Sequence, residues 1–508
     1  MRVARSQRVN LLGRWGAAAA IAALLALGAC SLLLDRNTTE CTTNADCLRF
    51  AVQPFCQAGA CVKTLPPCFL GTPGDAGNFL NQCTTATCFS FNDCQRLDLC
   101  DGAAPPPPIA PPSQPAVSTP LAEAGTIPNC ASEPMGPGGL VYVTGSSNFP
   151  TLLKKVAPYI LAGAGPAVIY QTTNSCTGAA RIFSDAGTIS DPPDGGKNYA
   201  EYYNSSGTPE TCLLGPGGHS VDVGESDVYS TTCNSQYSTS SGVYNDHTGP
   251  AQGMAFVVNA ASSQFSISQS AAVEVLGLGG DDGRASPWTN PNRYYIRNKN
   301  TGTQQMIALQ INVPAAQFWG VDQGSAQNVH DQLASLAPDE AEQAIGIISV
   351  DVYDSDRTNL KVLAFKAAGQ ECGYLPDSTS ASFDKQNVRD GHYPIWGPLH
   401  FFTSTNNNNS TAALQFVGFF AEEPTSAGLL DAFISASLVP NCAMAVFRPG
   451  NEELGALAPV DPTSVSSCAC YFLSQTMSTP PAECTSCSKD SMCPASRPAC
   501  NFGFCEVH

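Results

Sequence analysis

YYIRNKNTGTQQMIAL, residues 294–309, is the stretch from which the fold of this chain is predicted. Its first three residues favour a β-strand that ends at Arg297, and a helical spacing of apolar residues follows a short polar turn. Thr301, Gly302 and Thr303 stand at the predicted helix start, where the first backbone amides lack partners within the helix and carry partial positive charge. Two hydroxyls, these amides and a guanidinium together are suited to bind an anion.

Two earlier stretches predict the same kind of strand-to-helix junction. The strand over residues 140–143, LVYV, is followed by TGSSNFP, in which Ser147 or Asn148 is a candidate N-cap. The strand over residues 167–170, AVIY, is followed by TTNSCTGAARIF, which places Ser175 near a helix start. One such polar residue is more often a simple cap than a ligand contact, but three junctions in one chain favour a shared anion site.

The composition is typical of a large exported protein and not of a nucleic-acid-binding one. At 508 residues the chain is long enough for two lobes and additional segments, and only 13% of its residues are charged. Its formal net charge of −18 argues against a nucleic-acid partner, because binding to a phosphate backbone needs clustered Lys and Arg. No catalytic, metal or dinucleotide motif is complete, so we expect no cofactor, no metal and no enzymatic activity.

The N-terminus has the features of a bacterial lipoprotein signal. Arginines precede an apolar run over residues 17–27 that is too short to span a membrane, and Leu-Gly-Ala-Cys then ends at Cys30. We expect residues 1–29 to be removed and Cys30 to carry several acyl chains, which together give a stable anchor. Ser31 replaces the aspartate that resembles an inner-membrane retention signal, which favours the outer membrane. An ordinary signal peptide with an incidental cysteine is the alternative.

Cysteines are concentrated in a module over residues 30–103 and in a tail over residues 456–508, where few large aliphatic residues are available for a core. Cross-links replace such a core in small exported modules. Both segments share a C-x5-C that is followed, after six to eight residues, by C-x4-C, which indicates a repeat. Besides Cys30, the cysteines of the module are Cys41, Cys47, Cys56, Cys61, Cys68, Cys83, Cys88, Cys94 and Cys100. The cysteines of the tail are Cys468, Cys470, Cys484, Cys487, Cys493, Cys500 and Cys505.

Zinc binding is the alternative for some of these thiols, above all at the C-x2-C pair Cys484 and Cys487. Disulfides are favoured because an exported chain meets an oxidising compartment, and no second C-x2-C pair stands at finger spacing. Of the 23 cysteines, 22 remain once Cys30 is set aside, and this even number permits complete pairing. The spacing does not show which cysteines pair.

Residues 104–129 form a proline-rich linker with four consecutive prolines at 105–108. Proline at this density favours an extended, semi-rigid spacer that holds the next domain away from the N-terminal module. Residues 130–455 then show the strand and helix patterns of a globular α/β domain.

The order of the motifs in this domain resembles that of the phosphate-binding proteins of bacterial ABC importers, within the type II periplasmic solute-binding proteins. TGSSNFP, YQTTNSCTG, VDVGESD, MAFVVN, PWTNPNRYYIRNKNTGTQQ and AIGIISVDVY follow one another in the family's order over residues 138–450. The resemblance implies an α/β fold of two lobes that close on a ligand like a flytrap, with two chain crossings at a hinge. Lobe one would take residues 138–253 and a return segment after about residue 375, with lobe two between them.

The resemblance also implies the ligand contacts, residue by residue. The family's first turn has a hydroxyl residue followed by Phe, which matches Asn148 and Phe149, with Ser147 as a neighbouring replacement donor. The serine of the second turn matches Ser175. The aspartate after G-x-S matches Asp227, which would accept a hydrogen bond from a protonated ligand oxygen and so favour phosphate over sulfate. The family's arginine and its Ser/Thr-Gly-Thr turn match Arg297, Thr301, Gly302 and Thr303.

Three features depart from the family's pattern. Lys299 stands where the family usually has an aspartate that pairs with the arginine, and Asn148 replaces a hydroxyl residue. The connection between the second and third motifs is longer than in the family, with Cys212 and Cys233 near its end. We hypothesise that these two cysteines form a disulfide that clamps the insertion near the mouth of the cleft, which peptide mapping that found both thiols free would contradict.

We therefore expect a lipid-anchored solute-binding protein that captures inorganic phosphate or a similar oxyanion between two lobes. The lipid anchor would contact the membrane, and an ABC permease is a candidate partner. The alternative is a structural or surface-interaction lipoprotein that uses the flytrap domain as a scaffold and the cysteine-rich modules as contact sites. Lys299 and the outer-membrane address favour that alternative, because the receptor of an importer must reach the inner membrane. A hydrolase is a third, less favoured class.

Overall fold

The computed structural model describes residues 55–57, 60–62, 79–97, 99, 105–111, 127–184, 188–189, 199–215, 218–280, 283–405, 411–421, 426–450, 452–453, 456–461 and 466–507. The chain divides into two compact units, residues 1–68 and residues 69–508. The expected signal segment 1–29 and the expected lipidation site Cys30 lie outside the described residues. In the first unit, strands β1 (Phe55–Gln57) and β2 (Ala60–Val62) pair antiparallel.

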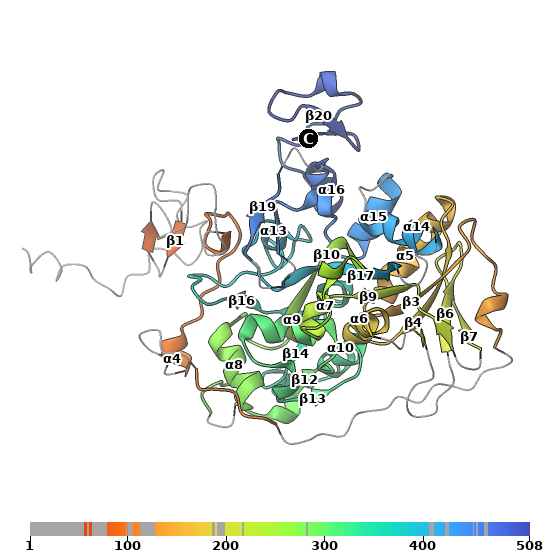
Figure 1. Ribbon diagram of the computed structural model, residues 1–508. Coiled ribbons are helices and arrows are strands. Elements are labelled where there is room, and N and C mark those ends of the chain that lie inside the picture. The colour runs from red at the N-terminus through yellow and green to blue at the C-terminus, as the bar shows by residue number, and fades with distance from the viewer. Residues whose placement is uncertain are drawn as a thin grey trace, which may run out of the picture. The chain divides into compact units, whose positions relative to one another are not determined.

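The crossing between the two lobes of the second unit is formed by strands β10 (Tyr244–Asn259), β14 (Ile345–Ser349), β15 (Leu360–Val362) and β17 (Trp396–Ser404). The first part of β10 pairs with β17 and its second part pairs with β14 and β15 (Figure 1). The change of partner falls between Gly253, which lies opposite Trp396, and Met254, which lies opposite Ser349. One continuous strand therefore belongs to both lobes, and its middle is a hinge.

Lobe one is built on the strands β3 (Leu140–Gly145), β4 (Ala167–Thr172), β6 (Tyr199–Tyr203), β7 (Pro209–Leu213) and β9 (Val223–Ser226). Together with β10 and β17 they follow the order β10-β17-β9-β3-β4-β6-β7, and β3 is parallel to both β4 and β9. Its helices are α5 (Phe149–Ala162), α6 (Ser175–Phe183), α14 (Thr411–Ala421) and α15 (Ala427–Ser435). Because side chains alternate along a strand, Val141 and Val143 pack with α5, α14 and α15, whereas Tyr142 packs with α6 on the other face.

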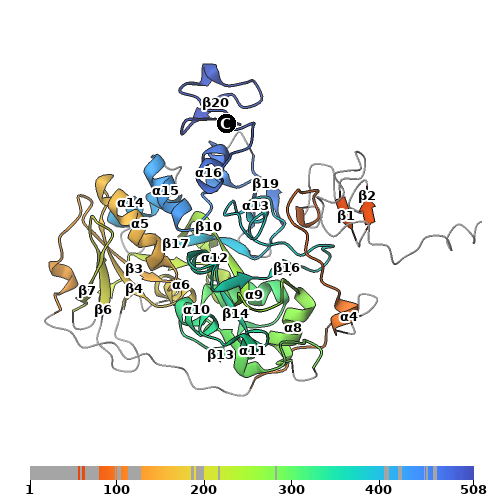
Figure 2. The ribbon, with the colours of Figure 1, turned by 180° about the vertical axis from the view of Figure 1, so that it is seen from behind.

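Lobe two contains strands β12 (Tyr294–Ile296) and β13 (Val321–Asp322) and helices α8 (Gln269–Leu278), α9 (Gly302–Ile311), α10 (Ala326–Ala334) and α12 (Val350–Ser355). Strand β12 runs parallel to β13 and β14, and β14 runs antiparallel to β10. Met254 and Phe256 pack with α8 and α9 on one face of this sheet. Ala255 and Val257 pack with α10 and α12 on the other face. Helices α10 and α12 are labelled in Figure 2.

Residues 79–97, which lie within the predicted cysteine-rich module of residues 30–103, pack against lobe two. Helix α4 (Asp93–Leu97) and the ring of Phe91 belong to the same apolar core as α8 and α9. A disulfide between Cys88 and Cys372 cross-links this segment to lobe two.

Residues 105–111, in the first part of the proline-rich linker, also contact lobe two. The backbone amide of Ile109 donates to the Gly277 carbonyl at 2.9 Å, and the Ile109 carbonyl accepts from Trp319 Nε1 at 2.8 Å. Ile109 therefore lies against lobe two.

The chain returns from lobe two to lobe one at residues 394–396, later than the position after residue 375 that the resemblance implies. Met254 N donates to the Ile395 carbonyl at 2.9 Å, so the two crossings lie side by side. The Tyr393 hydroxyl donates to the Met254 carbonyl at 2.7 Å and ties the return to the first crossing.

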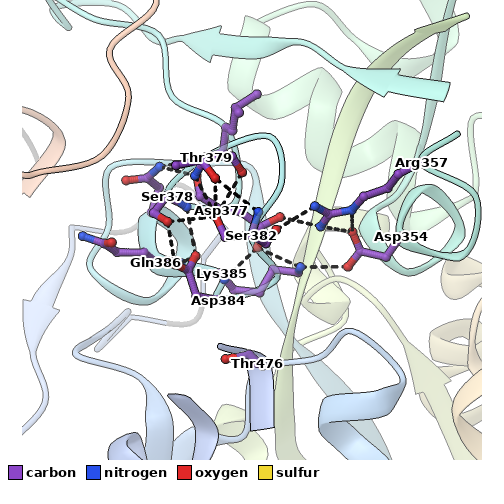
Figure 3. Close-up of polar contacts among 12 residues, drawn as sticks. Asp354, Arg357, Asp377, Ser378, Thr379, Ser382, Asp384, Lys385, Gln386 and Thr476 are labelled. Atoms are coloured by element: carbon purple, nitrogen blue, oxygen red, sulfur yellow. Dashed lines mark hydrogen bonds and ion pairs between the residues drawn. The ribbon is translucent and has the colours of Figure 1, made fainter. Parts of the chain in front are cut away.

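Buried ion pairs explain why residues 377–386 remain in lobe two (Figure 3). Lys385 Nζ lies 2.8 Å from Asp354 and 3.0 Å from Asp377. Arg357 Nη2 lies 2.7 Å from Asp377, so the two carboxylates are offset by two cations. This network fixes the polar segment to the end of α12, and nothing in the local pattern of that segment predicts it.

The C-terminal tail is cross-linked by disulfides, as the sequence predicts. Cys442 pairs with Cys468, next to helix α16 (Ala469–Thr476), and the tail pairs are Cys470–Cys484, Cys487–Cys500 and Cys493–Cys505. The two cysteines considered for zinc are therefore each in a disulfide. In the hairpin of β20 (Ala499–Asn501) and β21 (Phe504–Glu506), Cys500 lies opposite Cys505, as Cys56 lies opposite Cys61 in β1 and β2. The shared register supports the predicted repeat.

The predicted disulfide between Cys212 and Cys233 is wrong. Cys212 pairs with Cys130, and Cys233 pairs with Cys176. The reason is that Cys212 lies in β7, at the outer edge of the lobe-one sheet, whereas Cys233 ends the short helix α7 (Ser230–Cys233). The part of the insertion at residues 199–213 thus extends the sheet as the β6–β7 hairpin.

Other short elements are β5 (Thr188–Ile189), β8 (His219–Ser220), β11 (Ser266–Ser268), α11 (Pro338–Ala341), β16 (Ala364–Lys366), α13 (Gln386–Arg389), β18 (Val446–Phe447) and β19 (Ala458–Pro459). Within the ranges given above, no helix has both the length and the apolar character needed to cross a membrane. The predicted fold class is confirmed: the domain is a two-lobed α/β structure of the periplasmic-binding-protein type, with disulfide-rich segments beside it.

Candidate functional site

The three helix starts predicted from the sequence meet at the hinge. Helices α5 and α6 begin in lobe one, and α9 begins in lobe two. The side chains of Asn174 and Thr301 cap α6 and α9, whereas Asn148, at the N-cap of α5, makes no side-chain cap and is available for other contacts. The amide of Gly302, at the start of α9, donates to Ser175 Oγ at 3.0 Å, so groups from the two lobes are in direct contact.

Asp227, directly after β9, is the buried acceptor of the site. Its Oδ2 accepts from Ser146 Oγ at 2.7 Å, Ser175 Oγ at 3.2 Å and Asn148 Nδ2 at 3.2 Å. Its Oδ1 is buried and has no hydrogen-bond partner among the described residues. Burial raises the pKa of Asp227, although these donors and Arg297 oppose the shift.

Ser175 links this aspartate to α9. Its Oγ accepts from the amide of Gly302 and, at 3.3 Å, from the amide of Asp227. A Cβ atom at residue 302 would lie 2.5 Å from Asp227 Cβ and 2.7 Å from Ser175 Oγ. Only glycine therefore permits this close approach of the lobes. Asn148 Nδ2 adds a long contact to Thr303 Oγ1, at 3.4 Å, across the same boundary.

Arg297 is 1% exposed and lies at the end of β12, as the sequence predicts. Its Nη2 donates to Ser147 Oγ at 2.9 Å and to the Gly324 carbonyl at 3.3 Å. Its Nε and Nη1 are buried without partners among the described residues. Lys299, which replaces the family's aspartate, is exposed, so a hydroxyl and a carbonyl hold this guanidinium in place of a carboxylate.

The charge of Arg297 persists despite its burial. Desolvation lowers the pKa of Arg297 to about 10, and the negative charges of Asp227, Asp322 and Asp351 act in the opposite direction. At neutral pH the site therefore contains a full positive charge, with two guanidinium nitrogens that have no partner among the described residues.

Two of the predicted residues use their side chains elsewhere. The Phe149 ring packs in the lobe-one core, 5.3 Å from the Tyr170 ring and 5.6 Å from the Phe401 ring. The Thr301 hydroxyl donates to the Asn298 carbonyl at 2.7 Å and serves the cap of α9. The structure brings the other predicted residues together, namely Ser147, Asn148, Ser175, Asp227, Arg297, Gly302 and Thr303.

Ser146, Glu225 and Tyr170 are site residues that the sequence analysis did not identify. Glu225 Oε2 accepts from the Ser146 amide at 2.7 Å and from the Tyr170 hydroxyl at 3.0 Å, and so fixes the loop before α5. Burial and the nearby Asp227 raise the pKa of Glu225 well above its usual range. TGSSNFP contains two adjacent serines, and only the folded loop shows that Ser146 contacts Asp227 whereas Ser147 contacts Arg297.

Asp351, at the start of α12, is a further carboxyl group near the site. Gln252 Nε2 donates to Asp351 Oδ1 at 3.3 Å, from the first crossing strand. Burial raises the pKa of Asp351 to about 6, and the negative charge of Asp227 contributes to the shift. The ionisation of this group therefore changes the field at Arg297 within an accessible pH range.

No protein-family model and no curated protein sequence matches the chain. Among solved structures it is similar to an ABC-type phosphate transport receptor from Vibrio cholerae, with 12% identity and a TM-score of 0.38 over 59% of this chain and 100% of that one. A phosphate-binding protein from Stenotrophomonas maltophilia matches with 16% identity and a TM-score of 0.38, over 59% and 90% of the two chains. PstS from Borrelia burgdorferi matches with 13% identity and a TM-score of 0.33, over 59% and 98%. At such identities and TM-scores the interpretation of the site rests on its own geometry.

Proposed function

We propose that this chain binds inorganic phosphate, or a closely similar oxyanion, between its two lobes and performs no chemistry on it. The observation that carries the proposal is a set of buried polar atoms without partners: Asp227 Oδ1 from lobe one and Arg297 Nε and Nη1 from lobe two. Leaving such atoms unpartnered in a protein interior is costly. An anion with at least one acidic proton satisfies all of them, because it accepts from the guanidinium and donates to the carboxylate.

The surrounding groups suit a small tetrahedral anion. Hydroxyls of Ser147 and Thr303 and the helix starts of α5, α6 and α9 lie around the charged pair, and helix starts favour negative charge. The carboxylate of Asp227 discriminates by proton content, since sulfate at neutral pH has no proton to donate and meets like charge there. The acidic net charge of the chain does not oppose this, because nearby donors dominate the field at a buried site.

The cellular setting extends the proposal. The disulfides support an exported protein in an oxidising compartment, since cytoplasmic thiols are kept reduced. A lipid on Cys30 would then anchor the chain to the cell envelope, at the outer membrane, and the captured anion would be passed to an ABC permease or retained by scavenging. Metabolic labelling with a fatty acid, compared between the wild type and Cys30→Ser, tests the anchor: equal labelling of both proteins contradicts it.

Equilibrium dialysis with radiolabelled phosphate and sulfate tests the ligand class. We expect the full chain to bind phosphate at least about a hundredfold more tightly than sulfate. Asp227→Asn should narrow this ratio by about tenfold or more, because an amide can donate to a fully deprotonated oxygen. Equal affinities of the wild type for the two anions, or an unchanged ratio in the variant, would contradict the proposed role of Asp227.

A scaffold function is the second candidate, and direct bonds between the lobes favour it. Ser175 Oγ accepts from Gly302 N, and Cys176 N donates to the Asn300 carbonyl at 3.1 Å, so each lobe contacts the other directly. In this reading the lobes stay closed, and the cysteine-rich segments make the functional contacts. Small-angle scattering distinguishes the anion-binding function from the scaffold function. A radius of gyration that decreases when phosphate is added supports anion capture by lobe closure, and a constant radius of gyration supports the scaffold.

A further inference from the structure

The disulfide between Cys176 and Cys233 lies beside the two principal lobe-one groups of the proposed anion site. Cys176 is the second residue of α6 and follows Ser175 directly. Cys233 ends α7, a helix that begins three residues after Asp227. The bond therefore joins the two backbone segments that carry Ser175 and Asp227.

These two groups depend on their mutual position. Ser175 Oγ lies 3.2 Å from Asp227 Oδ2 and accepts from Asp227 N at 3.3 Å. Both distances are near the upper limit for a hydrogen bond, so a displacement of either segment by about 1 Å breaks both contacts. The position of Ser175 also sets the bond to Gly302 N, at 3.0 Å, by which lobe two meets lobe one.

Helix α7 needs tethers, because its four residues, Ser230–Cys233, are too few for a stable isolated helix. Glu453 provides one, since its carboxylate accepts from Tyr229 N at 2.5 Å and from the Thr232 hydroxyl. The disulfide provides the covalent link to α6. Both of its cysteines are half-buried, which leaves them within reach of an exchange partner.

We propose that the Cys176–Cys233 disulfide is a positioning element of the anion site, and that the chain becomes competent to bind phosphate only when this bond forms after export. This inference rests on the proposed function. On formation, the two thiols lose two protons and two electrons to the disulfide of a thiol–disulfide oxidant, which becomes a dithiol. The reduced chain holds Ser175 and Asp227 less firmly, so cytoplasmic phosphate does not close its lobes before export.

Calorimetric titration of the oxidised full chain with phosphate tests the inference, with Cys176→Ser/Cys233→Ser as the site variant. The matched control is Cys130→Ser/Cys212→Ser, which removes a disulfide of the same lobe at the outer edge of its sheet. Both variants should have lower melting temperatures than the wild type, because both lose a cross-link. Only the site variant should also lose phosphate affinity, by about tenfold or more.

Equal affinity of the site variant and the wild type, or an equal loss in both variants, would overturn the inference while leaving the proposed function intact. Absence of binding by the folded wild type would overturn both. If the site variant does not fold, the unmodified protein is titrated before and after dithiothreitol treatment, with circular dichroism to confirm folding and peptide mapping of an alkylated aliquot to locate reduced thiols. Unchanged affinity with Cys176 and Cys233 reduced would then overturn the inference.

Discussion

Asp227 and two carboxyl groups that interact with it, Glu225 and Asp351, have different surroundings, and these surroundings separate their roles. Asp227 accepts from three side-chain donors and keeps one oxygen without a partner, as a ligand acceptor requires. Glu225 accepts from a backbone amide and a tyrosine hydroxyl, and so supports a loop. Asp351 accepts a long hydrogen bond from Gln252, and burial raises its pKa although hydrogen bonding from Ser349 opposes the shift. Carboxylates this close to one another do not ionise independently.

Asp351→Asn should alter the pH dependence of stability. Burial raises the pKa of Asp351 to about 6, above the value of about 3.9 expected in the unfolded chain. The folded state therefore retains a proton that the unfolded state loses, and the unfolding free energy falls as the pH rises from about 4 to about 6. The variant should be more stable than the wild type at pH 7.5 by up to about 3 kcal/mol and nearly equal to it at pH 3.5, in chemical denaturation.

Asp356→Asn is a control of opposite sign. Hydrogen bonds from Thr358 and Asn359 lower the pKa of Asp356, so its contribution to stability is present above the unfolded-state pKa and is lost as the pH falls through the folded-state value. This variant should be less stable than the wild type at pH 7.5, with a difference that shrinks on acidification. If Asp351→Asn changes the unfolding free energy equally at pH 3.5 and pH 7.5, the result would contradict a raised pKa of Asp351.

Residue identities near the site were predictable where a motif fixes the backbone position. Arg297 at a strand end and Gly302 at a helix start follow from the pattern YYIRNKNTGTQQ. The contacts of Ser146 and Ser147, before α5, were not predictable, because the side chains of adjacent residues in a loop point in different directions. Glu225 was missed because an acidic residue in a predicted strand is usually exposed, and its partner, Tyr170, is remote in sequence.

At the scale of elements, the start of α9 is where Gly302 of lobe two contacts Ser175 and Asp227 of lobe one. Gly302→Ala places a Cβ within 2.5 Å of Asp227 Cβ, so α9 must move away from lobe one. We expect phosphate affinity to fall by about a hundredfold. The melting temperature should change little, because the hinge lets the lobes part and alanine is favourable in a helix.

Gly450→Ala is the matched control for this substitution. A Cβ at residue 450 would meet no atom of the described residues within 4 Å, so the phosphate affinity of Gly450→Ala should equal that of the wild type. Calorimetric titration measures the phosphate affinity of both variants, and thermal unfolding measures their melting temperatures. Wild-type affinity in Gly302→Ala would show that the start of α9 does not meet lobe one in the bound state.

The strand and helix elements of both lobes could be predicted, and their cross-links could not. Strands that end in polar turns before amphipathic helices are encoded locally, which is why β3, β4 and β12 appear where the pattern places them. The pairing of Cys212 with Cys130 depends on an edge hairpin that brings residues distant in sequence together. Likewise, the late return to lobe one depends on the ion pairs of Lys385, which no local pattern reveals.

At the scale of the whole molecule, one long strand and one return segment connect two lobes that each contribute half of a charged pair. Asp227 belongs to lobe one and Arg297 to lobe two, so the proposed anion would contact both lobes and couple binding to closure. The segments at residues 79–97 and 105–111 are attached to lobe two, and thus move with it. Anchoring at Cys30 remains a prediction, as does transfer to a permease.

The most direct measurement of the central claim is calorimetric titration of the full chain with phosphate, for the wild type, Arg297→Ala and Lys299→Ala. Lys299 is an exposed cation two residues from Arg297 and controls for the loss of one positive charge in the same turn. We predict micromolar or tighter binding by the wild type and Lys299→Ala, and a loss of at least about a hundredfold in Arg297→Ala. A wild-type protein that is folded by circular dichroism, yet gives no heat and no thermal stabilisation with phosphate, would contradict the claim.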